Sequence, residues 1–72
     1  MFPDRLRELL SLSGLGKQEF AKRRCGVSYP MFNRYLNGFA DPSIETLARI
    51  ARTCGVSQEW LRGNSDDREA DL

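Results

Sequence analysis

The tetrapeptide Cys-Gly-Val-Ser occurs twice in this chain, at residues 25–28 and again at residues 54–57. In each copy the glycine can adopt the left-handed conformation that ends a helix, and the serine can cap the helix that follows. The valine before each serine is placed to pack against the fourth residue of the next helix, Phe32 in one copy and Leu61 in the other. The repeat therefore predicts two tight helix-to-helix corners.

Glycines and prolines divide the chain into five short segments with apolar residues at helical spacing. The segments run from about Pro3 to Leu12, from Lys17 to Arg24, from Tyr29 to Leu36, from Ile44 to Thr53, and from Ser57 to Gly63. No segment alternates with the period of two that a half-buried strand requires. We therefore expect an all-α fold, a compact domain of five helices spanning residues 1–63.

Helical spacing also predicts which residues form the core. In the fourth segment the apolar residues share one face, whereas Arg49 and Arg52 fall on the other. The two cysteines lie at matching helix ends, where we interpret them as small buried hydrophobic residues rather than redox or metal-binding groups. The expected core comprises Leu6, Leu9, Leu10, Phe20, Ala21, Phe32, Tyr35, Ile44, Leu47, Ala48, Ala51 and Cys54.

The composition argues against several classes of function. A chain of 72 residues forms one domain, without room for separate catalytic and substrate domains. It has no His, the commonest general base, and its two Cys cannot complete a zinc site of four protein ligands. With no long apolar run and no signal peptide, we expect a cytoplasmic protein with reduced thiols, no membrane contact and no cofactor. We expect no enzymatic activity, because a serine nucleophile would need a buried Lys17 or Lys22 as its base.

The net charge of +1 conceals an uneven distribution. Residues 17–34 carry five basic side chains and one acidic one, a net charge of +4. Residues 64–72 carry four carboxylates against one Arg, a net charge of −3, and they lack apolar periodicity. We expect this acidic segment to be a disordered tail or a linker. A basic window can be a solvated surface or a nucleic-acid patch.

Residues Lys17 to Gly38 have the layout of a helix-turn-helix, in which the second helix lies in the major groove of DNA. Ala21 is small enough to let the two helices approach, and Gly26 permits the turn. With Phe32 and Tyr35 facing the core, the residues that point away include Tyr29, Pro30, Asn33 and Arg34. Arg can bond a guanine edge, and Asn an adenine edge, with two hydrogen bonds each. The alternative is ordinary helix packing with a solvated outer face.

In combination, these motifs resemble the lambda-repressor-like helix-turn-helix family, which includes phage repressors, Cro proteins and many small bacterial regulators. The resemblance extends from residue 5 to about residue 63. It rests on Gln18, Phe20-Ala21, Gly26-Val27-Ser28, Phe32, Tyr35, Gly38, Pro42, the run Ser43 to Ala51, and Gly55-Val56-Ser57 with Trp60-Leu61. It implies a transcriptional repressor or regulator whose third helix reads operator DNA, as a homodimer on a two-fold site.

The resemblance and the basic window together imply roles for individual residues. Base reading falls to Tyr29, Pro30, Asn33 and Arg34. Contacts with the DNA backbone fall to Lys17, Gln18, Lys22, Arg23, Arg24, Ser28, Asn37 and Phe39. Dimer contacts in this family usually come from the last helix or beyond, here Trp60 to Leu72. Family repressors commonly continue into a C-terminal domain, so the partners implied are DNA, a second copy and such a domain or another protein.

The chain departs from the family pattern in the second helix. Between Ala21 and Gly26 it has one more residue than usual, as if Lys22, Arg23 or Arg24 were inserted. The second helix is then longer or the turn looser. We prefer the register that keeps Phe20 and Ala21 in the core, because the other would place Lys22 at a buried position.

A different class of function is an antitoxin-type regulator or other protein-interaction module, in which DNA binding is secondary. Such a module would present an apolar stripe on the first or the fifth helix. Leu12, Phe39 and Trp60 are the candidates, although each also suits the core or its rim.

Overall fold

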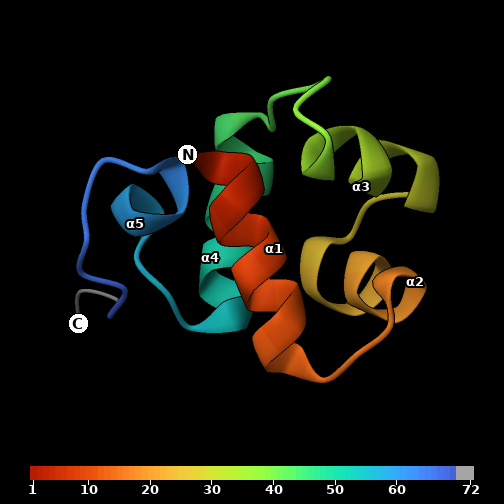
Figure 1. Ribbon diagram of the computed structural model, residues 1–72, viewed down its shortest axis with the longest axis horizontal. Helices are drawn as coiled ribbons and strands as arrows, with labels where there is room; N and C mark the ends of the chain where they lie inside the picture. The colour runs from red at the N-terminus through yellow and green to blue at the C-terminus, as the bar shows by residue number, and fades with distance from the viewer. Residues whose placement is uncertain (70–72) are drawn as a thin grey trace.

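The computed structural model describes residues 1–69 of the 72-residue chain, and that part is helical apart from turns and loops (Figure 1). An isolated antiparallel bridge between Val56 and Glu69 is the one β-type pairing within these residues. The elements are α1 (Phe2–Ser13), α2 (Lys17–Phe20), the π-helical segment η1 (Ala21–Cys25), α3 (Tyr29–Leu36), α4 (Ile44–Cys54) and α5 (Gln58–Arg62). The predicted all-α domain of five helices is confirmed, with η1 continuing α2.

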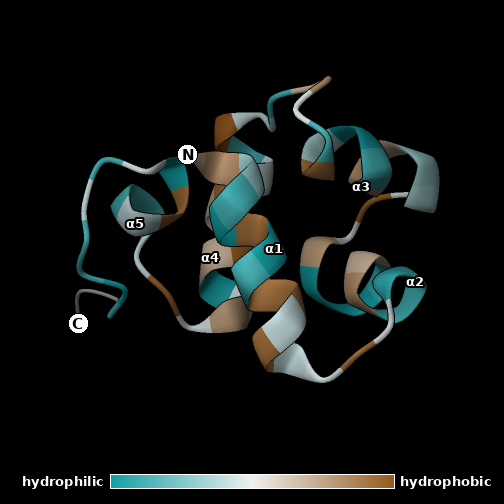
Figure 2. Ribbon diagram, in the orientation of Figure 1, coloured by the Kyte–Doolittle hydropathy of each residue, from teal (hydrophilic) through white to brown (hydrophobic). Residues whose placement is uncertain are grey.

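The helices pack around a single core. In Figure 1, α1 crosses the front of the molecule with α4 behind it, while α2 and α3 lie at one end and α5 at the other. The apolar faces of the helices are turned inward (Figure 2). The residues that are fully enclosed and largest are Leu6, Phe20, Cys25, Phe32, Ile50 and Leu61. The domain measures 30 × 23 × 19 Å, and none of its described helices is long and apolar enough to cross a bilayer.

Both predicted corners form as the repeated tetrapeptide indicates. The hydroxyl oxygens of Ser28 and Ser57 accept hydrogen bonds from the backbone N–H groups of Met31 and Trp60, each at 3.3 Å. Gly26 and Gly55, two residues before these serines, have φ angles of 68° and 70°, which are unfavourable for a residue with a side chain. Identical local sequence thus produces identical caps at the start of α3 and of α5.

The extra residue of the second helix is absorbed as a π turn. Continuing α2 as an α-helix would place Arg24, four residues after Phe20, on the buried face. The π turn places the fifth residue there instead, and Cys25 is 1% exposed. The N–H groups of Gly26 and Val27 both bond the carbonyl of Ala21, which closes the turn. Phe20 and Ala21 are buried and Lys22 is exposed, as the preferred register requires.

Three apolar residues lie differently from the expectation. Ile44, assigned to the core, is 71% exposed, because it is the first residue of α4 and lies ahead of the turn that contacts the core. Leu12 and Phe39 are 63% and 76% exposed rather than part of the core or its rim. Trp60 is buried at 3% exposure, so α1 and α5 present no continuous apolar stripe to solvent.

The acidic segment is held against the domain as far as it is described. After α5, residues 64–69 run back along the molecule, and the N–H of Ser57 donates to the carbonyl of Arg68 at 3.0 Å. This differs from the expected unattached tail, because the sequence gives no sign of partners on α1. Residues 70–72, the end of that segment, fall outside the described residues. The domain boundary at residue 63 stays a prediction.

Candidate nucleic-acid interface

The second and third helices are joined as a helix-turn-helix at one end of the molecule. The segment α2–η1 ends at Cys25 and α3 begins at Tyr29, so the corner contains the three residues 26–28. The rings of Phe20 and Phe32 meet across it with centroids 5.6 Å apart, inside the core. This aromatic pair fixes how α3 lies on α2.

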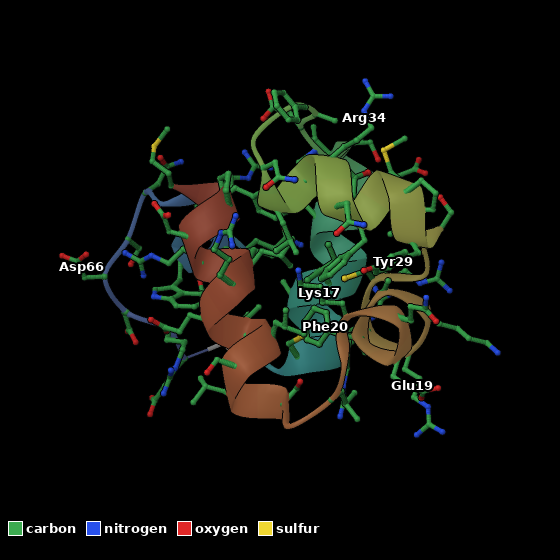
Figure 3. The ribbon with its side chains drawn as sticks, turned by 45° about the vertical axis from the view of Figure 1, so that its right-hand side comes forward. Lys17, Glu19, Phe20, Tyr29, Arg34 and Asp66 are labelled. Carbon is green, nitrogen blue, oxygen red and sulfur yellow. The ribbon has the colours of Figure 1, made fainter. Side chains whose placement is uncertain are left out.

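Helix α3 is divided lengthwise into a buried and an exposed side. Phe32, Tyr35 and Leu36 are at most 6% exposed and pack into the core. The four residues predicted to read bases lie on the opposite side of the helix. Tyr29, Pro30 and Arg34 are exposed there, and Asn33 is half-buried. Figure 3 shows Arg34 projecting away from the domain, whereas Phe20 is directed into it. The structure therefore brings all four residues onto one surface.

The C-terminal end of α3 is held by α1. The Nη2 atom of Arg7 donates to the carbonyl of Leu36 at 2.8 Å and to the Oδ1 of Asn37 at 3.4 Å. A cation is favourable here, because the last carbonyls of a helix carry partial negative charge. Asn37 is predicted to contact the DNA backbone. Its side-chain oxygen accepts from Arg7, so its side-chain NH₂ group stays available to an acceptor.

Lys17 and Gln18 are exposed residues of α2, and Lys22 is an exposed residue of η1. Among residues 1–69, neither lysine forms an ion pair, so both are available to phosphates. Arg23 differs, because its Nε lies 2.7 Å from the Oε2 of Glu19 one turn earlier. Ser28 accepts a bond from Met31 and keeps its own hydroxyl proton to donate.

Two other residues predicted to contact the DNA backbone, Arg24 and Phe39, also make contacts within the domain. Arg24 is half-buried and lines a pocket of about 360 Å³ together with residues of α1 and α4, among them Leu9 and Thr53. The N–H of Phe39 donates to the carbonyl of Arg34 at 2.9 Å, so this N–H is not free for phosphate, although the side chain is exposed. The contacts of Arg24 and Phe39 with the DNA backbone stay predictions.

The cysteines lie beside this region without contributing to it. Burial, together with the nearby Cys54, raises the pKa of Cys25 to about 12, which keeps the thiol protonated. Burial also raises the pKa of Cys54, while the neighbouring Arg24 guanidinium opposes the rise. Both thiols are free, and within the described residues no three Cys, Asp or Glu side chains gather as a metal site would require.

Two arginines that support α3 could not be assigned from the sequence. Arg7 reaches α3 across 29 positions of the chain. Arg49, on the outer side of α4, lies against Gly26 at the corner. Helical spacing correctly placed Arg49 outside the core, but spacing carries no information on which neighbour an exposed side chain will cover.

Comparisons with known proteins agree with this geometry. Residues 3–62 match the family described as helix-turn-helix domain. Over 60 residues the chain is 43% identical to a Haemophilus influenzae protein named uncharacterized HTH-type transcriptional regulator. That match covers 83% of this chain and 24% of the relative, so the chain spans about a quarter of the relative's length. No solved structure gives a significant match.

Proposed function

Since the chain belongs to the helix-turn-helix family, of the lambda-repressor-like type, we propose that it binds double-stranded DNA sequence-specifically and acts as a transcriptional repressor. The observation that carries this proposal is the division of α3, whose buried side is formed by Phe32, Tyr35 and Leu36. The other side carries the exposed Arg34 and the half-buried Asn33. A helix of this width fits the major groove, where base pairs differ in their hydrogen-bonding groups. Such a regulator would act in the cytoplasm of a prokaryotic cell.

Base discrimination is assigned to four residues of α3. Arg34 is suited to two hydrogen bonds with a guanine, and Asn33 to two with an adenine. Pro30 has no N–H and offers an apolar surface, suited to a thymine methyl group. Tyr29, at the first position of α3, is 37% exposed and completes the surface.

Phosphate contacts are assigned to residues around α3. Lys17 and Lys22 supply charges that form no ion pair within residues 1–69, and Ser28, Gln18 and Asn37 supply neutral donors. Arg23 would contact a phosphate only if its guanidinium left the carboxylate of Glu19 for a phosphate oxygen. Because each neutralised phosphate releases counterions, binding should weaken as salt is raised.

A second copy of the chain is the proposed partner on DNA. A single small module buries only about 600–1,000 Å² on DNA, so useful affinity favours a dimer on two half-sites. A groove of about 280 Å³, lined by Phe2, Asp41, Pro42, Ile44, Leu47 and Arg62, supports a surface for it. Ile44 is 71% exposed at this groove, and Asp41 and Arg62 form no ion pair among residues 1–69. In a two-fold dimer, Asp41 of each copy would face Arg62 of the other.

The dimer surface is tested by charge exchange. Asp41→Arg and Arg62→Asp should each weaken self-association in sedimentation equilibrium with operator DNA, and the double exchange should restore it. Arg52→Asp, an exposed change on α4 outside the groove, is the control for net charge. If all four variants associated as strongly as the unmodified chain, this groove would be excluded as the dimer surface.

Selection from random duplex DNA at low and high salt tests the function as a whole. Enrichment of an inverted repeat with half-sites about one helical turn apart supports a reader that dimerises on DNA. Enrichment of a single half-site supports base reading and removes the dimer from the proposal. Salt-sensitive binding without an enriched sequence would contradict base reading and leave a non-specific basic surface.

The alternative of a protein-interaction module has less support. It would need an apolar stripe on α1 or α5, and Leu12 is the one large hydrophobic side chain exposed on those two helices within the described residues. A single exposed leucine is ordinary for a protein surface.

A further inference from the structure

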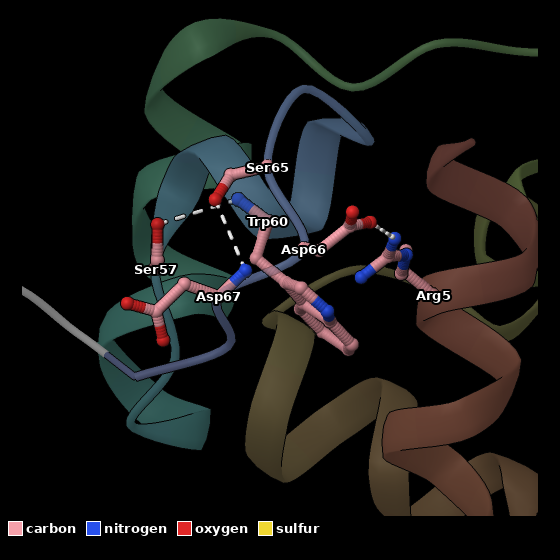
Figure 4. Close-up of polar contacts among 6 residues, drawn as sticks. All are labelled: Arg5, Ser57, Trp60, Ser65, Asp66 and Asp67. Atoms are coloured by element: carbon pink, nitrogen blue, oxygen red, sulfur yellow. Dashed lines mark hydrogen bonds and ion pairs between the residues drawn. The ribbon is translucent and has the colours of Figure 1, made fainter.

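Residues 64–69, here called the strap, return from α5 toward α1 and contact it at two points. The Nη2 of Arg5 lies 3.5 Å from the Oδ1 of Asp66, and the Nη1 of Arg68 lies 3.3 Å from the Oε2 of Glu8 (Figure 4 shows the first pair). Helix α1 supplies the cation of one pair, Arg5, and the anion of the other, Glu8. The strap supplies the oppositely charged partners, Asp66 and Arg68. Docking the strap in this direction therefore satisfies both pairs at once.

Trp60 lies beneath this double contact. The guanidinium carbon of Arg5 is 4.7 Å from the centre of the indole ring, and that of Arg68 is 6.0 Å from it. Both distances are within the range of attraction between a cation and an aromatic face. Trp60 is 3% exposed, so the residues that clasp α1 to the strap also cover the indole.

The strap has its own local order. The N–H of Asp67 donates to the Oγ of Ser65 and the N–H of Glu69 donates to the Oδ1 of Asp67, each at 3.1 Å. At its far end, Glu69 forms the antiparallel bridge with Val56. The end of the strap is tied to the corner between α4 and α5 by this bridge and by the bond from the N–H of Ser57 to the carbonyl of Arg68. Its attachment to α1 depends on the two ion pairs.

The attachment is of a kind that salt can release. The side chain of Asp66 is fully exposed, those of Arg68 and Glu8 are about half exposed, and that of Arg5 is 22% exposed. Exposed ion pairs contribute little individually and are screened by added salt. The apolar core, by contrast, does not depend on ionic strength in this way.

We propose that residues 64–69 form a releasable strap, closed over Trp60 by the pairs Arg5–Asp66 and Glu8–Arg68, which opens when these pairs are screened or broken while the helical domain stays folded. The strap and α3 lie at opposite ends of the molecule (Figure 1), and Figure 3 shows Asp66 and Arg34 at opposite edges. The closed strap thus holds the carboxylate of Asp66 far from Arg34.

Trp60 is the single Trp of the chain, so its fluorescence reports on the strap without a label. Acrylamide quenching is measured on the full chain at low and high salt for the unmodified protein, Glu8→Arg, Arg68→Glu and the double exchange. In low salt, we expect quenching to rise about twofold in each single variant and to return toward the original value in the double exchange, because the pair is re-formed with reversed polarity. High salt should raise quenching in the unmodified protein, with unchanged far-ultraviolet circular dichroism.

The matched control is the ion pair of α2 and η1. Glu19→Arg and Arg23→Glu break a pair of similar exposure at the other end of the domain and should leave Trp60 quenching unchanged. Equal quenching in the unmodified protein and both single strap variants would overturn the proposal. So would failure of the double exchange to restore protection, or a salt-induced rise accompanied by loss of helical signal.

Discussion

The guanidinium group of Arg49 in α4 lies directly against Gly26, so closely that a Cβ atom on Gly26 would come within 2.8 Å of its Cζ and Nη1 atoms. At Gly55, the equivalent position of the repeated tetrapeptide, a Cβ would meet nothing within 4 Å. The two glycines have the same left-handed conformation and the same local sequence. They differ in what the tertiary structure places over them, and in the helix they end, because Gly26 closes the π turn η1 and Gly55 closes the α-helix α4.

This difference predicts unequal effects of the same substitution. Gly55→Ala should destabilise the domain by about 1 kcal/mol, the cost of a side chain in the left-handed conformation. Gly26→Ala should cost that amount and, in addition, displace Arg49 from the corner. Urea unfolding of both variants measures the difference. In an Arg49→Ala background the two substitutions should become equal, and a difference that persisted there would show that Arg49 is not its cause.

The π turn predicts that one basic residue of the second helix is dispensable for folding. Deleting Arg23 brings Cys25 four residues after Phe20, so a regular α-helix would place both on the buried face. We expect this deletion to keep the fold, with stability within about 1 kcal/mol of the full chain.

The control for this deletion is removal of Arg52 from α4. That helix has no extra residue to lose, so the deletion would rotate Gly55 and Val56 relative to the core and should lower the unfolding temperature much further. Thermal unfolding followed by circular dichroism compares the two. Equal losses would contradict the interpretation of η1 as an absorbed insertion.

The proposed roles in DNA binding predict two kinds of loss. Arg34→Ala should cost about 1–3 kcal/mol on the selected site and relax preference at one base. Lys22→Ala should weaken all sequences alike and reduce the salt dependence by about one counterion. Titrations of matched and mismatched duplexes at several salt concentrations separate these effects.

Arg52→Ala serves as the control in those titrations, because it removes the same charge from the far side of α4. It should change affinity less than either variant. If Arg34→Ala retained full preference at every base, α3 would not read sequence through this residue.

The buried thiol of Cys25 predicts a loss of stability in alkali. Its pKa is raised from 9.0 to about 12 in the folded chain, so between these values the folded state binds the proton more tightly than the unfolded state. This contribution is present below about pH 9 and is lost as the pH rises toward 12. Between neutral and alkaline pH, the urea midpoint of unfolding should therefore fall less in Cys25→Ala than in the unmodified chain. Parallel declines would exclude Cys25 as a source.

The sequence was sufficient for the parts of the structure that depend on neighbouring residues. The serine caps at positions 28, 43 and 57, the glycine helix ends and the apolar faces follow from local spacing, and the structure agrees with them. The choice of register in the second helix was also available, because burying Lys22 would have been costly. The candidate reading side of α3 could be predicted for the same reason, since Phe32 and Tyr35 define the opposite side.

Tertiary structure alone decided which distant groups meet. A local pattern reports whether a side chain is inside or outside, but an exposed charge finds its partner only after the helices have packed. Arg7 at Leu36, Arg49 at Gly26 and Arg68 at Glu8 are such meetings, each between residues far apart in the chain. Ile44 is exposed because it is the first residue of α4 and lies ahead of the turn that contacts the core. Cys25 rather than Arg24 is buried because the second helix ends in a π turn.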